Sequence, residues 1–232
     1  MPTDKIILTF GGGGVTHGCD PELEDFSLRI VPPRPNLGYI GWANEDDALR
    51  ITRFYDRFAD HAREVSHLPM GAPPKALNDW LADKDMVYFG GGRSDALIAA
   101  LSDDATWPVL RAAYDRGCVL AGVSAGGVCW YDWILSDSGG QGYRPIVGLS
   151  LVKSGVCPHF SSEAARQPAF QKAMTERPGA RGYAVDDGVC LVAVNGVPRG
   201  HFSARAGHAA YALRSDADGR ISQSVVPRFQ PA

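Results

Sequence analysis

The chain has 232 residues, a net charge of −3 and 45% hydrophobic residues, which is enough apolar material for one large buried core. This charge gives no basic footprint for a nucleic acid, and no apolar run reaches the roughly 18 residues that a membrane helix needs. The five scattered cysteines form no C-x-x-C motif, so they indicate neither a zinc site nor a disulfide framework. We therefore expect a single domain over residues 1–232, with no metal, cofactor, nucleic-acid or membrane partner.

Short apolar runs alternate with helical patterns in the first part of the chain, which predicts an α/β fold around a mainly parallel sheet. The predicted strands cover residues 6–10, 37–42, 86–89 and 118–123. A helix capped by Asn44 follows the second strand, and further helices are predicted at about 94–101 and 107–116. The chain enters its first strand directly, without a long apolar segment or a cleavage signature, so we expect a cytoplasmic protein.

The pattern changes after about residue 146. Strand-like runs at 183–186, 189–194 and 208–213, with Asn195-Gly196 between two of them, predict hairpins. The tail from Asp216 is polar, and we expect it to fray.

The strongest chemical signal is Gly122-Val123-Ser124-Ala125-Gly126, a G-x-S-x-G pattern after an apolar strand. In a nucleophile elbow the strand ends, the chain turns sharply and a helix begins, so that the serine hydroxyl stands at the edge of the sheet. The alternative is a plain Gly-Ser turn. If Ser124 is a nucleophile, the protein catalyses acyl transfer, and the amide of Ala125 is one donor for the oxyanion.

A serine nucleophile needs a base, and six histidines are available. His159 is the best placed, because it follows a short run of small and apolar residues and opens a polar loop, the position where sheet enzymes carry catalytic groups. The others lie beside the first glycine run, in or just after an upstream helix, or in the C-terminal strands: His17, His61, His67, His201 and His208.

The base needs an orienting carboxylate, for which the residues leave two candidates. Asp187 follows a strand-like run, and Asp137 lies 13 residues after the serine. Either could instead be a turn aspartate that caps its own backbone. A second oxyanion donor is expected from the triple glycine at residues 90–92. The earlier glycine run at residues 11–14 lacks the lysine and the register of a phosphate-binding loop.

Taken in order, these motifs resemble those of the peptidase E family of serine peptidases, which is related to cyanophycinase. The resemblance rests on Gly-x-Ser-Ala-Gly, on Phe-Gly-Gly-Gly upstream, and on Cys-Pro-His-Phe and Asp-Asp-Gly downstream. It implies a three-layer sandwich with a mainly parallel sheet, like that of class I glutamine amidotransferases. It also implies cleavage of short peptides after an N-terminal acidic residue, without a metal.

The resemblance implies roles for individual residues. Ser124 matches the nucleophile, His159 the base and Asp187 the acid, with Asp137 as the alternative acid. Gly92 and Ala125 match the oxyanion donors. Arg166 matches an arginine that binds the acidic side chain of the substrate. Arg93 stands where the family usually has asparagine after the triple glycine, and could itself bind a substrate carboxylate.

The sequence and the resemblance together thus predict a serine exopeptidase, a dipeptidase or aminopeptidase that acts through an acyl-enzyme on short peptides with an N-terminal Asp. A homodimer is compatible with a chain of this size. Two alternatives stay open. One is an esterase of the α/β-hydrolase type, in which the acid precedes the histidine in the chain. The other is a non-catalytic protein that binds small molecules on the same scaffold.

Overall fold

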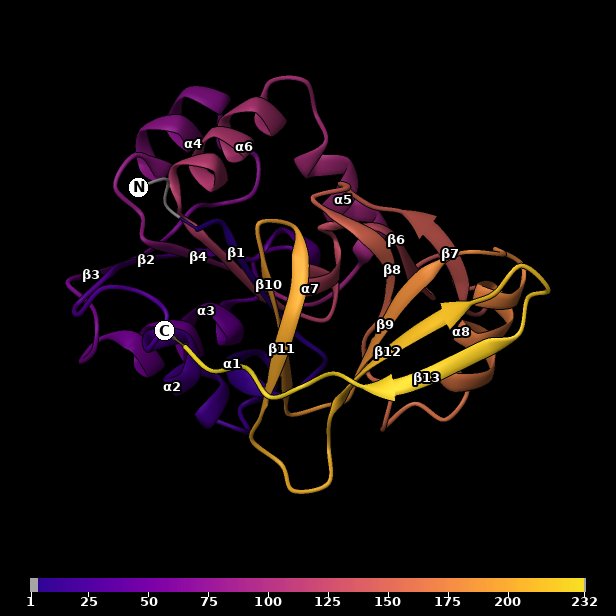
Figure 1. Cartoon of the computed structure of the whole chain (residues 1–232). Helices are drawn as coiled ribbons and strands as arrows, with labels where there is room; N and C mark the ends of the chain where they lie inside the picture. The colour runs from indigo at the N-terminus through magenta and orange to yellow at the C-terminus, as the bar shows by residue number, and fades with distance from the viewer. Residues whose placement is uncertain (1–3, 232) are drawn as a thin grey trace.

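The structure is a computed structural model that describes residues 4–231, in which the strands form two sheets (Figure 1). The seven-stranded sheet has the spatial order β11 (Val197–Ser203), β10 (Val189–Val194), β1 (Ile6–Phe10), β5 (Val119–Val123), β4 (Met86–Phe89), β2 (Asn36–Ile40) and β3 (Glu64–His67). The six-stranded sheet has the order β13 (Ile221–Val225), β12 (Ala210–Ser215), β9 (Arg181–Val185), β8 (Val152–Cys157), β6 (Tyr131–Ser136) and β7 (Arg144–Val147).

The seven-stranded sheet is parallel from β1 to β3, and β10 and β11 extend it in antiparallel fashion. Its central strands are apolar on both faces, as expected for a sheet covered by helices on each side. One face packs against α1 (Gly14–His17), α2 (Glu22–Leu28) and α3 (Ala48–Phe58). The other packs against α4 (Pro74–Leu81), α5 (Ser94–Leu101) and α6 (Thr106–Arg116). Figure 1 shows these two groups of helices on opposite sides of the sheet.

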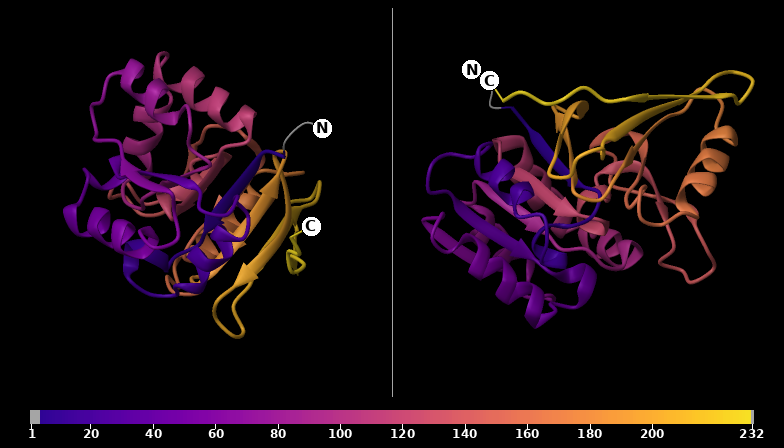
Figure 2. Two further views of the ribbon diagram at one scale, coloured as in Figure 1. Left: turned by 90° about the vertical axis from the view of Figure 1, so that its left-hand side faces the viewer. Right: turned by 90° about the horizontal axis from the view of Figure 1, so that it is seen from below.

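The six-stranded sheet lies beside the first sheet (Figure 2) and carries α8 (Arg166–Thr175) on one face. Two short elements, η1 (Trp42–Asn44) and α7 (Ala125–Val128), follow strands of the first sheet. The predicted α/β fold with parallel strands and intervening helices is therefore confirmed, although the sequence did not indicate that the strands divide between two sheets. Among the helices of residues 4–231, none combines the length and the apolar character needed to cross a membrane.

Two predictions near the second strand were wrong in detail. The strand ends at Ile40 and not at Trp42, because the chain turns at Gly41 into η1, where the Trp42 indole donates a hydrogen bond to the Leu68 carbonyl. The next helix is capped by Asp47 and not by Asn44, since the Asp47 carboxylate accepts from the Arg50 amide at 3.0 Å.

The C-terminal predictions were partly right. Asn195 and Gly196, with φ of 52° and 76°, form the tight turn of the β10–β11 hairpin. The runs at 183–186 and 189–194 do not pair with each other, because β9 belongs to the second sheet and β10 to the first. The expectation that the tail frays was also wrong. After the turn at Asp216, β13 pairs with β12, and Phe229 then packs edge-on against Phe26.

Candidate active site

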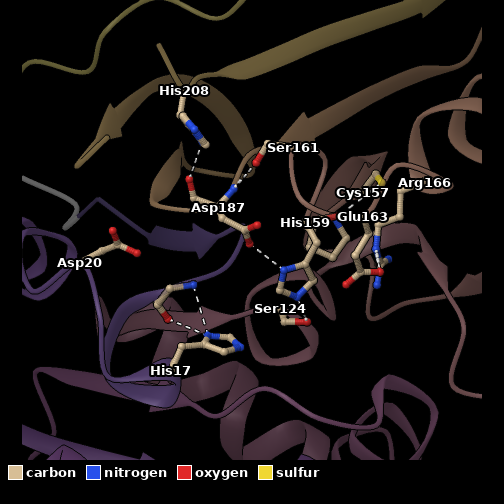
Figure 3. A network of polar contacts seen from close by, with 12 residues as sticks. His17, Asp20, Ser124, Cys157, His159, Ser161, Glu163, Arg166, Asp187 and His208 are labelled. Carbon is tan, nitrogen blue, oxygen red and sulfur yellow. Dashed lines mark hydrogen bonds and ion pairs between the residues drawn. The ribbon is translucent and has the colours of Figure 1, made fainter. Parts of the chain in front are cut away.

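The candidate site lies where the two sheets meet. Three neighbouring strands of the first sheet, β1, β5 and β4, run parallel, so the loops that follow them gather at one edge. These loops carry the first glycine run, Ser124 and the triple glycine. From the second sheet, β8 leads to His159 and β9 leads to Asp187. Figure 3 shows Ser124, His159 and Asp187 turned toward one another across this seam.

Ser124 stands on a strained turn between β5 and α7. Its φ of 50° and ψ of −123° are unfavourable for a residue with a side chain, and its amide is fixed by a 3.0 Å hydrogen bond to the Phe10 carbonyl. The flanking glycines permit the turn, because a Cβ on Gly122 would lie 2.4 Å from the Gly126 carbonyl oxygen and one on Gly126 2.1 Å from that of Phe89. This is the geometry of a nucleophile elbow.

His159 lies within hydrogen-bonding distance of both neighbours. Its Nε2 is 2.9 Å from Ser124 Oγ, and its Nδ1 is 2.7 Å from Asp187 Oδ1. An ionised carboxylate can only accept, so Nδ1 carries the proton and Nε2 is free to accept from the serine hydroxyl. The backbone of His159 is itself held at a φ of 53°, with its amide donating to the Gly11 carbonyl at 3.0 Å.

Asp187 is buried beneath this histidine, with 7% of its surface exposed. Burial alone would raise the pKa of the carboxyl group, but hydrogen bonds from His159 and Ser162 outweigh it and leave the pKa below its ordinary value. The first glycine run encloses the pair: a Cβ on Gly12 would lie 1.6 Å from Asp187 Oδ1 and 2.7 Å from His159 Nδ1. Close approach to this pair, and not phosphate binding, accounts for the glycine at position 12.

The other candidate acid, Asp137, lies elsewhere. It follows β6 with 57% of its side chain exposed, and its Oδ1 is 3.8 Å from Arg166 Nη2. Of the two carboxylates that the sequence left open, the structure therefore brings Asp187 to the histidine and Asp137 to an arginine.

The comparison with known proteins supports the same class of enzyme. The family model described as "Peptidase family S51" matches residues 7–197, most of the chain. The chain belongs to peptidase family S51. It is therefore a peptidase, and the resemblance to the peptidase E family is confirmed.

One related sequence and two solved structures agree with this assignment. The chain is 30% identical over 226 residues to the uncharacterized peptidase YgaJ of Bacillus subtilis (strain 168), covering 96% of this chain and 97% of that protein. Among solved structures, a peptidase from an acI-B1 actinobacterium shares the fold with a TM-score of 0.70, at 15% identity over 97% of this chain and 96% of that one. A putative peptidase E protein from Listeria monocytogenes EGD-e gives a TM-score of 0.61, at 14% identity over 83% and 95% of the two chains.

Of the two predicted oxyanion donors of this S51 peptidase, Ala125 directly follows the serine as the first residue of α7, and Gly92 lies in the loop after β4. Among the described residues, the amides of Gly92 and Ala125 donate to no other protein group, so both are free to bind a substrate oxygen. The triple glycine runs beside the serine, since a Cβ on Gly91 would lie 3.4 Å from that of Ser124. Asn44 Nδ2 and Arg50 Nη1 hold this loop by donating to the Gly91 carbonyl at 2.8 and 2.7 Å.

The two predicted substrate-binding arginines already have carboxylate partners. Arg93 is on the surface, with 64% of its side chain exposed, and pairs with Asp95 at 2.9 Å. Arg166 is buried, donates from Nε to Glu163 Oε2 at 2.7 Å, and lies over the ring of Tyr143 at 4.7 Å. Neither guanidinium group stands free at the serine.

Sequence reasoning assigned no role in this site to three residues that border it: His17, Asn44 and Glu163. The His17 ring meets that of His159 edge-on with a centroid separation of 6.0 Å, and its Nδ1 is 3.0 Å from the Gly13 carbonyl. The position of His17 just after the first glycine run was a usable signal. Asn44 and Glu163 carried none, because their roles depend on contacts with residues that the sequence alone does not place beside them.

Proposed function

We propose that this S51 peptidase is a serine exopeptidase that hydrolyses short peptides through an acyl-enzyme. The observation that carries the proposal is the hydrogen-bonded chain from Ser124 through His159 to Asp187, at 2.9 and 2.7 Å. This arrangement has the distances and the orientation that activate a serine hydroxyl, which is a poor nucleophile on its own.

In the proposed mechanism, Ser124 Oγ attacks the peptide carbonyl carbon while His159 Nε2 takes the hydroxyl proton. The amides of Gly92 and Ala125 donate to the negatively charged oxygen of the tetrahedral intermediate. The intermediate collapses, the C–N bond breaks, and the leaving amine receives the proton from His159. Water then attacks the acyl carbon with His159 again as the base, the ester bond to Ser124 Oγ breaks, and His159 returns the proton to the serine oxygen. Throughout, Asp187 holds the imidazole and stabilises its protonated form.

The resemblance also implies a preference for an N-terminal Asp, recognised by Arg166 or Arg93. The pairing of both guanidinium groups with carboxylates weighs against it, because a substrate carboxylate would have to displace Glu163 or Asp95. We therefore propose the broader class of short peptides as substrates, and an aspartyl preference becomes an outcome of the test.

The two rival functions are less well supported. An esterase of the α/β-hydrolase type places the acid before the histidine in the chain, whereas here Asp187 follows His159. A protein that only binds small molecules has no need for a serine held at a φ of 50° and hydrogen-bonded to a histidine.

The test is labelling with a serine-directed fluorophosphonate, combined with hydrolysis of Ala-Leu, Asp-Leu and a pentapeptide. We expect one label per chain at Ser124, loss of on the order of 10⁴-fold in kcat for Ser124→Ala, and cleavage of the pentapeptide next to its N-terminus. The matched control is Ser222→Ala, which alters an exposed serine on β13 and should change nothing. Absence of label, or Ser124→Ala activity within about tenfold of the wild type, refutes a serine mechanism. Asp-Leu hydrolysis about 10- to 100-fold faster than that of Ala-Leu would restore the aspartyl preference.

A further inference from the structure

Glu163 lies beside the catalytic histidine with one carboxylate oxygen fixed and the other available. The Glu163 amide donates to the His159 carbonyl at 3.1 Å, which closes a single turn between the two residues. Oε2 accepts from Arg166 Nε at 2.7 Å and from the Tyr143 hydroxyl at 2.5 Å. Within residues 4–231, Oε1 accepts no hydrogen bond, and 36% of the side chain is exposed, against 6% for Arg166.

The direction of this carboxylate is visible in Figure 3. One oxygen of Glu163 faces Arg166, and the other faces the side on which Ser124 and His159 lie. Arg166 and Tyr143 thus hold Oε2 of the carboxylate and leave Oε1 without a protein donor among the described residues.

The charges of this group suit a cation. Arg166 contributes one positive charge, and the neighbouring carboxylates of Glu163 and Asp137 contribute two negative ones. Burial would raise the pKa of Glu163, but hydrogen bonds from Tyr143 and Arg166 lower it below its ordinary value, so Glu163 is ionised at neutral pH. These three side chains together carry one surplus negative charge, which attracts an ammonium group.

We propose that Glu163 Oε1 binds the α-ammonium group of the substrate's N-terminal residue, and that Arg166 and Tyr143 are positioning residues for that carboxylate. This inference rests on the proposed function, because it concerns the substrate of the same site. In a peptide cleaved after its first residue, the α-nitrogen is two bonds from the carbonyl carbon that Ser124 attacks, so its partner must lie close to the serine. Glu163 is the carboxylate that follows the histidine hydrogen-bonded to Ser124, with its amide bound to the His159 carbonyl.

The assignment also explains how a peptidase of this form would select chain ends. An ammonium group offers three donors and a full charge, whereas the amide nitrogen of an internal residue offers one N–H and no charge. A peptide bound at an internal position would bring no charged donor to Glu163 Oε1, although Oε2 would keep its ion pair with Arg166. The same carboxylate therefore favours N-terminal residues and disfavours internal cleavage.

The experiment compares two substrates that differ only at the α-nitrogen: alanyl-leucine and propionyl-leucine, in which hydrogen replaces the ammonium group. For the wild-type enzyme we expect kcat/KM to be about 10- to 100-fold higher for alanyl-leucine, the effect of one charge-assisted hydrogen bond. Glu163→Gln should remove most of this preference by slowing alanyl-leucine, while propionyl-leucine stays within about threefold. Tyr143→Phe, which removes one support of the carboxylate, should reduce the preference by about 2- to 10-fold.

The matched control is Glu176→Gln, the same substitution at an exposed residue that follows α8. It should leave both substrates unchanged. Equal hydrolysis of the two substrates by the wild-type enzyme overturns the proposal without any variant, and so does an equal loss for both substrates in a folded Glu163→Gln protein. Fluorophosphonate labelling separates the two levels of inference. If Ser124 is labelled but alanyl-leucine and propionyl-leucine are hydrolysed equally well, only the proposed role of Glu163 fails. If Ser124 is not labelled and neither substrate is hydrolysed, the serine mechanism is refuted.

Discussion

The glycine at position 12 offers a direct test of the proposed acid–base pair, because its substitution touches neither the nucleophile nor the base chemically. Gly12 does not adopt a left-handed φ, so alanine is compatible with its backbone. The added Cβ, however, would lie 1.6 Å from Asp187 Oδ1 and 2.7 Å from His159 Nδ1. Gly12→Ala should therefore separate the two groups while preserving the fold.

The magnitude follows from the distances. A nonbonded contact to carbon needs about 3.5 Å, so the carboxylate oxygen or the loop must retreat by about 2 Å. The Nδ1–Oδ1 hydrogen bond starts at 2.7 Å and would then exceed the limit for a hydrogen bond. Loss of the orienting carboxylate costs about 10⁴-fold in kcat, and a misplacement of about 1 Å about 10²-fold, so we expect a loss of about 10²- to 10⁴-fold.

The assay is kcat/KM for alanyl-leucine together with the rate of fluorophosphonate labelling, and both should fall. Overpacking at a buried site costs about 1–3 kcal/mol, so thermal unfolding should still be cooperative, with a melting temperature lower by roughly 3–10 °C. The control is Gly139→Ala, where the new Cβ meets only the flexible end of the Arg144 side chain.

A double-mutant cycle completes the test. In an Asp187→Ala background the closest atom that the new Cβ strikes is gone and only the 2.7 Å approach to His159 Nδ1 remains, so Gly12→Ala should cost at least about tenfold less there than in the wild type. If folded Gly12→Ala protein keeps its activity within about threefold, or if the two substitutions have independent effects, the contact does not govern the pair and the reasoning is refuted.

Two further predictions concern the candidate site, and a third concerns the buried Glu24 of α2. Asp187→Asn should lower kcat by about 10⁴-fold and Asp137→Asn by less than about threefold, because only the former faces His159; the reverse order in steady-state kinetics contradicts the assignment. Asn44→Ala removes the 2.8 Å hydrogen bond to the triple-glycine loop, so kcat should fall by about tenfold with little change in KM, and a change confined to KM would argue for a role in binding instead. Burial raises the pKa of Glu24 to about 7, above its value in the unfolded chain. The folded state then binds a proton that the unfolded state has lost, so the free energy of unfolding should decline by on the order of 3 kcal/mol relative to Glu24→Gln between about pH 4.5 and 7, and level off above pH 7. Denaturant titrations over that range measure this, and parallel curves for the two proteins would exclude it.

The sequence was informative where structure depends on local pattern. The elbow serine, the strand at residues 6–10 and the helix at residues 94–101 were predictable, because glycine spacing and apolar periodicity act over a few residues. His159 was also indicated, since it opens a polar loop directly after an apolar segment. The structure places it 2.9 Å from the serine, although 35 positions separate the two in the chain.

The choice between Asp187 and Asp137 could not be made from local pattern. It depends on the crossing of the chain from β9 in the second sheet to β10 in the first, which occurs at Asp187 and its neighbours. The sequence showed two apolar runs there and suggested a hairpin, and nothing in the runs themselves says that they enter different sheets. Asn44 was likewise predicted as a helix cap, whereas its amide nitrogen reaches the Gly91 carbonyl. Both differences arise from pairing between distant segments.

The crossing has a consequence for how the proposed site is held together. The nucleophile belongs to the first sheet, whereas the base and its carboxylate arrive from the second, so their alignment depends on how closely the sheets approach. Two backbone hydrogen bonds span the seam, from the His159 amide to the Gly11 carbonyl at 3.0 Å and from the Gly188 amide to the Gly12 carbonyl at 2.9 Å. A Cβ on Gly11 would lie 2.3 Å from the Asp186 carbonyl oxygen, so a side chain there would force the sheets apart. Because Gly11 and Gly12 hold the backbones of His159 and Gly188, the first glycine run would set the geometry of the proposed proton transfer through its own backbone and its lack of side chains.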